Sequence, residues 1–192
     1  MKTTMRLFVP LGVCALLLAA GWSSPQPKPF AVDPAKTRVE FTLGSLLHTV
    51  HGEFKFKRGT LSFDPQSGKA SGELVVDATS GESGSAGRDK RMHAAILESA
   101  KYPEITFRPD RVDGNVVPQG KSVAQVHGVF AIHGAEHEIL LPITVDAAAG
   151  QYTVYGVFEM PYVKWGMKNP STLMLRVSDK VEITIRTVVH AM

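Results

Sequence analysis

The chain of 192 residues contains a single cysteine, Cys14, which lies inside an apolar run near the N-terminus. The residues after that run lack cysteine, which excludes disulfide bonds and thiolate chemistry from the rest of the chain. No basic block with interleaved aromatic residues is present, so the sequence gives no support to nucleic-acid binding. An internal repeat is also missing, and the length fits one domain of ordinary size.

A membrane-spanning apolar run is missing as well. Lys2 and Arg6 precede the apolar stretch 7–20, which Pro10 interrupts and which is shorter than the roughly 20 residues that span a bilayer. Small residues follow it. This pattern is typical of a secretory signal peptide, here residues 1–21. Retention of the segment as an uncleaved anchor is the alternative.

The predicted removal of the signal peptide determines which residues form the mature chain. Cleavage between Ala20 and Ser24 predicts a periplasmic or secreted protein with a short linker rich in proline and serine at 22–29. One domain then covers 30–192. Loss of the two basic residues of the signal lowers Lys+Arg from 21 to 19 against 18 Asp+Glu, so the mature chain is nearly neutral.

Helical periodicity is scarce, and alternation of apolar and polar residues dominates from residue 30 onward. Short turns separate the alternating runs, including an expected turn at Gly59, and no βαβ rhythm appears. We therefore expect about eight or nine antiparallel strands in a barrel or a sandwich. The runs are 38–43, 51–57, 61–63, 73–77, 105–107, 130–132, 140–145, 152–160 and 181–189.

One stretch breaks this pattern. Residues 88–100 lack glycine, proline and alternation, and they predict one amphipathic helix with Asp89 as its N-cap. Met92 and Ile96 lie on its apolar face, and Pro103 follows its end. Because an isolated apolar helix face needs cover, we expect it to close a barrel mouth or a sheet edge.

The charged cluster of this helix admits a catalytic interpretation. Asp89 and His93 are four residues apart, a spacing at which they could form an acid–base pair. No serine, cysteine or second carboxylate accompanies them at a nucleophile's spacing, so we favour a cap and a solvated helix face. The sequence thus predicts no catalytic residue and no enzyme.

Four histidines raise the alternative of a metal site. His48 and His51 are three residues apart, and His133 and His137 are four apart. The second pair flanks Gly134 at an expected hairpin turn, where the helical geometry of a metal-binding pair is lost. A catalytic metal usually needs about three convergent ligands, so we predict no metal ligand and keep a metal- or haem-binding barrel as an alternative.

The ordered set of motifs resembles the YceI-like family, also known as polyisoprenoid-binding or lipid-binding lipocalin-like proteins. The resemblance spans about 30–189 and is carried by FAVD (30–33), VEF (39–41), HGEFKF (51–56), GTLSFD (59–64), ILESAKYPEITF (96–107), GVFAIHG (128–134), LPITV (141–145) and VEITI (181–185). It implies an all-β fold, an extended antiparallel lipocalin-like barrel of about eight strands with one amphipathic helix inserted between strands.

The resemblance also implies a function, that of an exported, non-enzymatic carrier holding a polyisoprenoid or quinone-type lipid in an apolar channel. No cofactor is expected other than that bound lipid. A filled barrel acting as a structural or interaction module is a further alternative. An amphiphilic lipid is the expected partner, nucleic acid is not expected, and a transient membrane contact and a homodimer are left open.

The alternating apolar residues supply candidates for the channel wall, since large side chains on one strand face line a barrel interior. Met92 and Ile96 are expected to act as the lid, Trp165 to lie near an opening, and Arg88 to meet the polar head of the lipid. The expected wall residues are Phe41, Phe54, Ile105, Phe107, Phe130 and Phe158.

Overall fold

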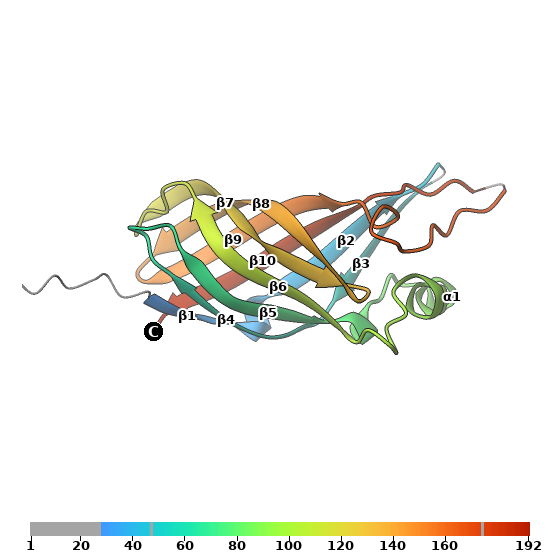
Figure 1. Cartoon of the computed structure of the whole chain (residues 1–192), viewed down its shortest axis with the longest axis horizontal. Coiled ribbons are helices and arrows are strands. Elements are labelled where there is room, and N and C mark those ends of the chain that lie inside the picture. Colours follow the sequence, from blue (N-terminus) through green and yellow to red (C-terminus); the bar gives the residue numbers. More distant parts are fainter. Residues whose placement is uncertain (1–27, 47, 174) are drawn as a thin grey trace, which may run out of the picture.

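A computed structural model describes residues 28–46, 48–173 and 175–192, which form one antiparallel sheet curled into a barrel (Figure 1). Eight strands close in the order β1-β4-β5-β6-β7-β8-β9-β10-β1, and the β2–β3 hairpin extends the wall from β10. The expected all-β barrel is confirmed, with two strands more than the closed ring needs. The strands are β1 Lys28–Val32, β2 Arg38–Gly44, β3 Thr49–Phe54, β4 Phe56–Phe63, β5 Ala70–Asp77, β6 Glu104–Asp113, β7 Gly120–Ile132, β8 Ala135–Ala148, β9 Gln151–Met160 and β10 Val181–Ala191.

Strand β10 divides one of its edges between two partners. Its last residues pair with β1, from Phe30 opposite Ala191 to Val32 opposite Val189. Its first half pairs instead with β2. Between them the chain makes the short 3-10 helix η1 (Pro34–Lys36), whose first turn is capped by the Asp33 carboxylate accepting from the Ala35 N–H at 3.0 Å. The barrel therefore narrows to a closed ring at one end and widens toward the β2–β3 hairpin at the other.

The predicted turn at Gly59 is wrong. Gly59 lies inside β4, and the break between β3 and β4 falls at Lys55. A Cβ atom on Gly59 would lie 2.6 Å from Cδ2 of Leu74 on the neighbouring strand. The glycine is thus required by close packing between strands, and not by a turn. The predicted signal peptide and nearly all of the predicted linker lie outside the described residues.

The predicted helix exists, but its limits and its cap differ from the expectation of 88–100. An α-helical turn, α1 (Ala86–Arg91), continues into a π-helical turn, η3 (Met92–Ile96), in which the Leu97 N–H donates to the Met92 carbonyl at 2.9 Å. Ser85 occupies the N-cap position. The helix ends at Ile96, seven residues before Pro103, because Glu98 adopts a left-handed φ of 47° and its carbonyl accepts the N–H groups of Lys101 and Tyr102.

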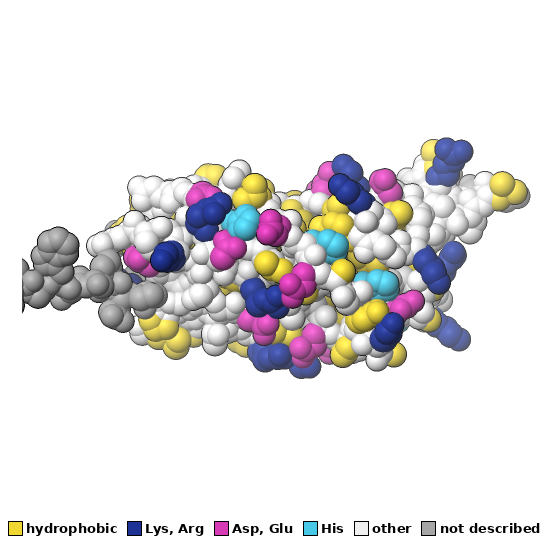
Figure 2. Space-filling model, in the orientation of Figure 1, with side chains coloured by type: hydrophobic (Ala, Val, Ile, Leu, Met, Phe, Trp, Pro, Cys, Tyr) yellow, Lys and Arg dark blue, Asp and Glu magenta, His cyan; other side chains and the backbone are white. Residues whose placement is uncertain are grey.

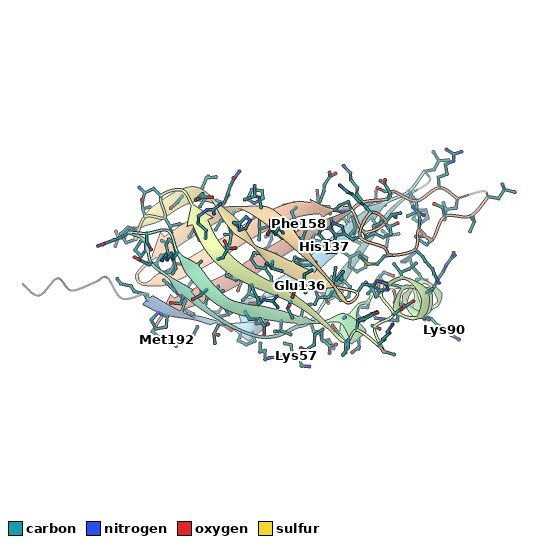
Figure 3. All side chains as sticks on the ribbon, viewed as in Figure 1. Lys57, Lys90, Glu136, His137, Phe158 and Met192 are labelled. Atoms are coloured by element: carbon teal, nitrogen blue, oxygen red, sulfur yellow. The ribbon has the colours of Figure 1, made fainter. Side chains whose placement is uncertain are left out.

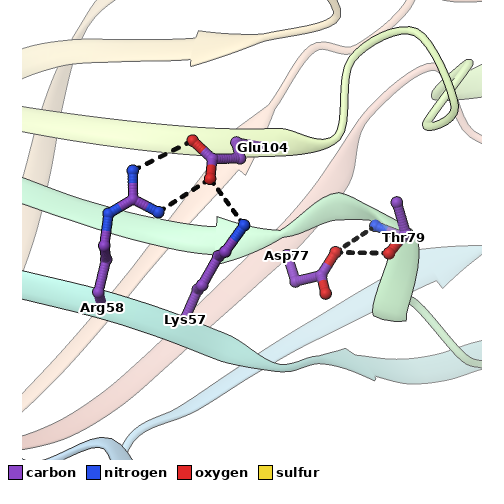
Figure 4. A network of polar contacts seen from close by, with 5 residues as sticks. All are labelled: Lys57, Arg58, Asp77, Thr79 and Glu104. Atoms are coloured by element: carbon purple, nitrogen blue, oxygen red, sulfur yellow. Dashed lines mark hydrogen bonds and ion pairs between the residues drawn. The ribbon is translucent and has the colours of Figure 1, made fainter.

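A second 3-10 turn, η2 (Ala78–Ser80), joins β5 to the segment before α1 and is capped by Asp77, whose carboxylate accepts the Thr79 N–H at 2.8 Å (Figure 4). No helix in the described part of the chain is both long and apolar enough to cross a membrane.

An ion-pair network links β4 to β6 on the outer face of the barrel near η2. The Glu104 carboxylate on β6 accepts from Lys57 Nζ at 2.8 Å and from both terminal nitrogens of Arg58 at 2.8 and 3.3 Å, reaching over β5 (Figure 4). These hydrogen bonds lower the pKa of Glu104 from 4.5 to about 2. A lowered carboxylate pKa contributes stability that is present above the ordinary value and is lost as the pH falls through the folded value.

Replacement of Glu104 by glutamine tests this bracing. We expect the wild-type free energy of unfolding to decline between about pH 4.5 and about pH 2 partly through Glu104, and this part of the decline to disappear in Glu104→Gln. Urea unfolding at several pH values measures it. Glu138→Gln is the control, since Glu138 is exposed and forms no ion pair with any described residue. Equal pH slopes for the two variants would contradict the role of the network.

Candidate functional site

The barrel encloses an apolar cavity of about 510 Å³ that extends under α1 and η3. Every strand except β8 contributes lining residues, together with the helix and the segment between β9 and β10. The apolar side chains of its wall include Val39, Phe41, Leu43, Val50, Phe54, Phe56, Leu74, Val76, Ile105, Phe107, Phe130, Ile132, Met160, Val181, Ile183 and Ile185. The interior is therefore not a filled core along its whole length.

Most of the residues predicted from alternation meet around this cavity. The rings of Phe41 and Phe54, on adjacent strands, lie 5.4 Å apart and form part of one wall. Met92 and Ile96 line it from the helix, at the position expected of a lid. The predicted residues that line the cavity are Phe41, Phe54, Arg88, Met92, Ile96, Ile105, Phe107 and Phe130.

Two residues of the predicted set do not line the cavity: Phe158, expected in the wall, and Trp165, expected near an opening. Phe158 is buried behind Phe130, with the two rings 5.5 Å apart and nearly perpendicular. Trp165 packs on Phe130 at 5.9 Å and stacks flat on His137, with ring centroids 4.0 Å apart and planes 3° apart. His137 and Phe158 lie on neighbouring strands of this side of the barrel (Figure 3). These side chains fill the interior next to β8, so the open space lies on the opposite side.

The helix covers the cavity with one face. Arg88, Met92 and Ile96 follow at intervals of four residues and all three line the cavity. His93 fixes the helix to the neighbouring loops, since its Nδ1 lies 2.9 Å from Ser99 Oγ and its Nε2 lies 2.8 Å from the Gly81 carbonyl oxygen. The lid is thus anchored by polar contacts on the side away from the cavity.

The catalytic interpretation of this helix receives no support from the contacts. Asp89 accepts hydrogen bonds from the N–H and hydroxyl groups of Ser83, and not from His93. Both candidates of the proposed acid–base pair are therefore used to hold the helix in place.

The cavity reaches the surface at one end, which we call the mouth. It is formed by the facing ends of β2 and β3 with their connection (43–46 and 48–50), by α1 and η3 (86–96) and by the segment after β9 (161–173 and 175–178). Exposed polar side chains line the cavity there: His48, Arg88 and Arg91. Figure 1 shows these elements at the end of the molecule opposite to the C-terminus.

The charged side chains among the described lining residues of the cavity are all arginines. No aspartate or glutamate is among the described residues that line the cavity, whereas Arg88 and Arg91 are. Arg88 donates to the Ser83 hydroxyl at 2.7 Å and to its carbonyl at 2.8 Å. The Arg91 guanidinium makes no hydrogen bond or ion pair with any residue that the structure describes, which leaves its donors available at the mouth.

Part of the lining was missed by the sequence prediction. Strand β10 contributes three lining residues that alternate along the strand, Val181, Ile183 and Ile185. The same alternation of apolar residues that identifies the wall phenylalanines could have identified them. Tyr162 and Met167 come from the irregular segment after β9, where no period exists to reveal them. The Tyr162 hydroxyl donates to the Ser178 carbonyl at 2.7 Å, and burial, with Asp179 nearby, raises the pKa of Tyr162 to about 12.

The histidines considered as metal ligands are separated. His133 and Gly134 form the tight turn between β7 and β8, with positive φ angles of 53° and 76°, while His137 lies under Trp165. His51 contacts Thr42 on the barrel wall. Among the described residues, no three His, Cys, Asp or Glu side chains come close enough to hold a metal ion.

These features define a class: a small closed antiparallel barrel whose interior holds an apolar cavity under a helical lid. The family follows from comparison with known sequences. The YceI-like domain matches residues 30–189, and the chain belongs to the YceI-like family.

Named relatives agree with this assignment. The UPF0312 proteins of Pseudomonas savastanoi pv. phaseolicola and Pseudomonas syringae pv. syringae are each 33% identical to this chain over 113 residues. These matches cover 56% of this chain and 56% of each relative, so the matched part spans just over half of their length.

Solved structures share the fold. BcnA of Burkholderia cenocepacia superposes with a TM-score of 0.70 at 21% identity, covering 82% of this chain and 98% of BcnA. A polyisoprenoid binding domain from Saccharophagus degradans, implicated in plant cell wall breakdown, gives 0.66 at 16% identity, covering 85% and 98%. The YCEI protein of Campylobacter jejuni gives 0.61 at 17% identity, covering 76% and 87%.

His137, which stacks on Trp165, leads to a prediction about the pH dependence of stability. Burial lowers the pKa of His137 below its usual 6.5, and its Nε2 is buried with no hydrogen-bond partner among the described residues. Because the unfolded chain binds this proton more readily, stability should fall as the pH drops below about 6.5. Urea unfolding from about pH 8 to about pH 5 measures this decline, which should be smaller in His137→Phe. His51→Gln, which removes an exposed histidine, should retain it, and a decline unchanged in His137→Phe would refute the assignment.

Proposed function

We propose that the protein is an exported, non-enzymatic carrier that holds a long-chain polyisoprenoid or quinone-type lipid in the barrel cavity. The single observation that carries this proposal is the apolar cavity of about 510 Å³ with cationic groups only at its mouth. The arrangement suits an amphiphile whose tail enters the barrel and whose head stays near the surface.

The size and chemistry of the cavity fit a hydrocarbon tail. An apolar cavity of roughly 150 Å³ is large enough to bind benzene, and this one is more than three times that volume. Each methylene transferred from water into such a space contributes about 0.8 kcal/mol. Several isoprene units inside the barrel would therefore supply most of the affinity, without any specific polar contact.

The head group would be oriented at the mouth. Arg88 and Arg91 are separated by one helical turn and both line the cavity, with His48 contributed by the β2–β3 turn. Carbonyl oxygens of a quinone, or the oxygens of another polar head, accept hydrogen bonds from guanidinium groups. Arg88 is the head contact predicted from the sequence, and the position of Arg91 in the cavity lining supports including it in the proposal.

The relatives support the same class of ligand. The similar Saccharophagus degradans domain is described as polyisoprenoid binding, and this chain shares its fold. The N-terminal pattern supports export to the periplasm or the exterior. The absence of a nucleophile with a matched base around the described cavity residues favours binding over catalysis.

Two alternatives to a lipid carrier are a filled barrel and a metal- or haem-binding barrel. A barrel filled throughout by side chains is contradicted by the cavity. A metal- or haem-binding barrel is favoured by no observation, since the histidines considered for it are dispersed over the described structure.

Blocking the cavity tests the proposal. Ile183 on β10 is buried and lines the cavity, so Ile183→Trp places a large ring where the tail would lie. Exclusion of even two methylene groups costs about 1.6 kcal/mol, or roughly tenfold in Kd. We expect at least that loss of affinity for a long-chain quinone, measured by titration with the ligand dispersed in detergent.

The matched control is Val123→Trp, since Val123 is 74% exposed on the outer face of β7. Both variants are first checked for a cooperative unfolding transition, and Val76→Phe is a smaller blocking change if Ile183→Trp is unstable. Full affinity in a folded blocking variant would rule out the cavity as the tail site.

The arginines at the mouth give a second test. In the double variant Arg88→Gln, Arg91→Gln we expect affinity for a quinone to fall roughly tenfold, the effect of losing one charged hydrogen bond of about 1.5 kcal/mol. Affinity for a polyprenyl hydrocarbon without a polar head should not change. Lys90→Gln is the control, because Lys90 points away from the barrel (Figure 3). An equal loss for both ligands would show that the arginines support the lid and do not contact the head.

A further inference from the structure

Two exposed leucines project from the mouth. Leu46, at the tip between β2 and β3, is 73% exposed, and Leu173, in the segment between β9 and β10, is 100% exposed. Their segments run side by side, since the Leu46 N–H donates to the Arg176 carbonyl at 3.0 Å and Ser45 pairs with Val177. The two leucines therefore project from neighbouring segments at the same end of the molecule as the cavity opening.

Positive charge gathers on the same end. The mouth elements carry Arg88, Lys90, Arg91, Lys164, Lys168 and Arg176, all exposed, and a single carboxylate, Asp89. None of the six cations forms an ion pair with a described carboxylate. Without Lys2 and Arg6, the chain has 19 Lys+Arg against 18 Asp+Glu. The mouth is thus strongly basic on a protein that is otherwise slightly acidic.

Exposure alone would not distinguish these leucines. Val123 and Leu140 are 74% and 53% exposed, but they lie on the outer faces of β7 and β8 and outside the elements that form the mouth. Isolated apolar side chains of that kind are ordinary on protein surfaces. At the mouth, in contrast, two apolar tips stand among unpaired cations around the cavity, and Figure 2 shows hydrophobic and basic side chains together at that end.

We propose that the mouth docks onto the surface of a membrane containing anionic phospholipids, with Leu46 and Leu173 inserted among the head groups. The cations are attracted to the negative lipid surface, and the leucines gain free energy by leaving water. Docked in this way, the cavity opens directly onto the bilayer. A water-insoluble lipid then enters or leaves the barrel without crossing the aqueous phase, an advantage that rests on the proposed carrier function.

Flotation with lipid vesicles tests the docking. The mature protein is mixed with vesicles of phosphatidylcholine containing phosphatidylglycerol, or of phosphatidylcholine alone. We expect flotation mainly with the anionic vesicles and a marked reduction by high salt, as electrostatic attraction requires. The double variant Leu46→Ser, Leu173→Ser should bind these vesicles at least tenfold more weakly, since it loses the burial of two leucines.

Each variant has a matched control. Val123→Ser, Leu140→Ser removes two exposed apolar groups elsewhere on the surface, 74% and 53% exposed, and should bind as the wild type does. The variant Lys164→Gln, Lys168→Gln, Arg176→Gln should lose the salt-sensitive part of binding, whereas Lys28→Gln, Lys69→Gln, Lys121→Gln should retain it. The proposal is overturned if the wild type does not bind anionic vesicles. It is also overturned if the Leu46→Ser, Leu173→Ser variant floats as well as the Val123→Ser, Leu140→Ser control.

Two further measurements separate the remaining explanations. Loss of a dimer in size-exclusion chromatography, without a change in flotation, would assign the tips to self-association and refute docking. Quinone binding in detergent is measured on the same variants, and the tip variant should bind as the wild type does. A wild type that docks but takes up no quinone would refute the carrier function and leave the docking intact.

Discussion

The structure depends on the divided edge of β10. A strand with one partner along its whole edge would close the barrel evenly, whereas β10 pairs with β1 at its end and with β2 along its first half. The chain crosses from one partner to the other through η1, where the Asp33 N–H donates to the Val188 carbonyl at 2.9 Å. Closure at one end and widening at the other follow from this single change of partner.

The wide end requires a cover that strands do not provide. The β2–β3 hairpin reaches the segment after η2 through paired N–H and carbonyl groups of Glu53 and Glu82 at 2.9 and 3.0 Å. The helix then lies over the opening, held by His93 and Asp89 on its polar side. Asp89 and His93, which the sequence offers as an acid–base pair, therefore hold the helix in position. The apolar face of the helix lines the cavity.

The two sides of the interior differ for a packing reason. Trp165, His137 and Phe158 stack behind Phe130 and fill the space next to β8. Away from β8, strands β2, β5 and β10 line the cavity with Val, Leu and Ile side chains and with Phe41, and the centre stays open. The stacked rings thus fill one side of the interior, and the other lining residues surround the free volume.

Much of this could be predicted from alternation, because a period of two assigns each strand residue to one face. It identified Phe41, Phe54, Ile105, Phe107 and Phe130, and it could have identified Ile183. Alternation does not show whether an inward side chain reaches the cavity or lies behind another one. It therefore predicts Phe158 in the cavity wall, although this ring lies behind Phe130. Sequence alone predicts a turn at Gly59, because it does not reveal that Leu74 approaches this residue across the sheet. The left-handed Glu98 that ends the helix likewise depends on tertiary contacts.

The central claim is that the cavity holds a lipid tail, and native mass spectrometry of the exported protein tests it most directly. The protein would be purified without detergent from cells that make isoprenoid lipids. The account predicts a complex with one lipid per chain, whose added mass matches a polyisoprenoid or quinone-type molecule and which is lost in Ile183→Trp. A wild-type protein that is always found alone, and that takes up neither quinones nor polyprenols when they are supplied, would contradict it.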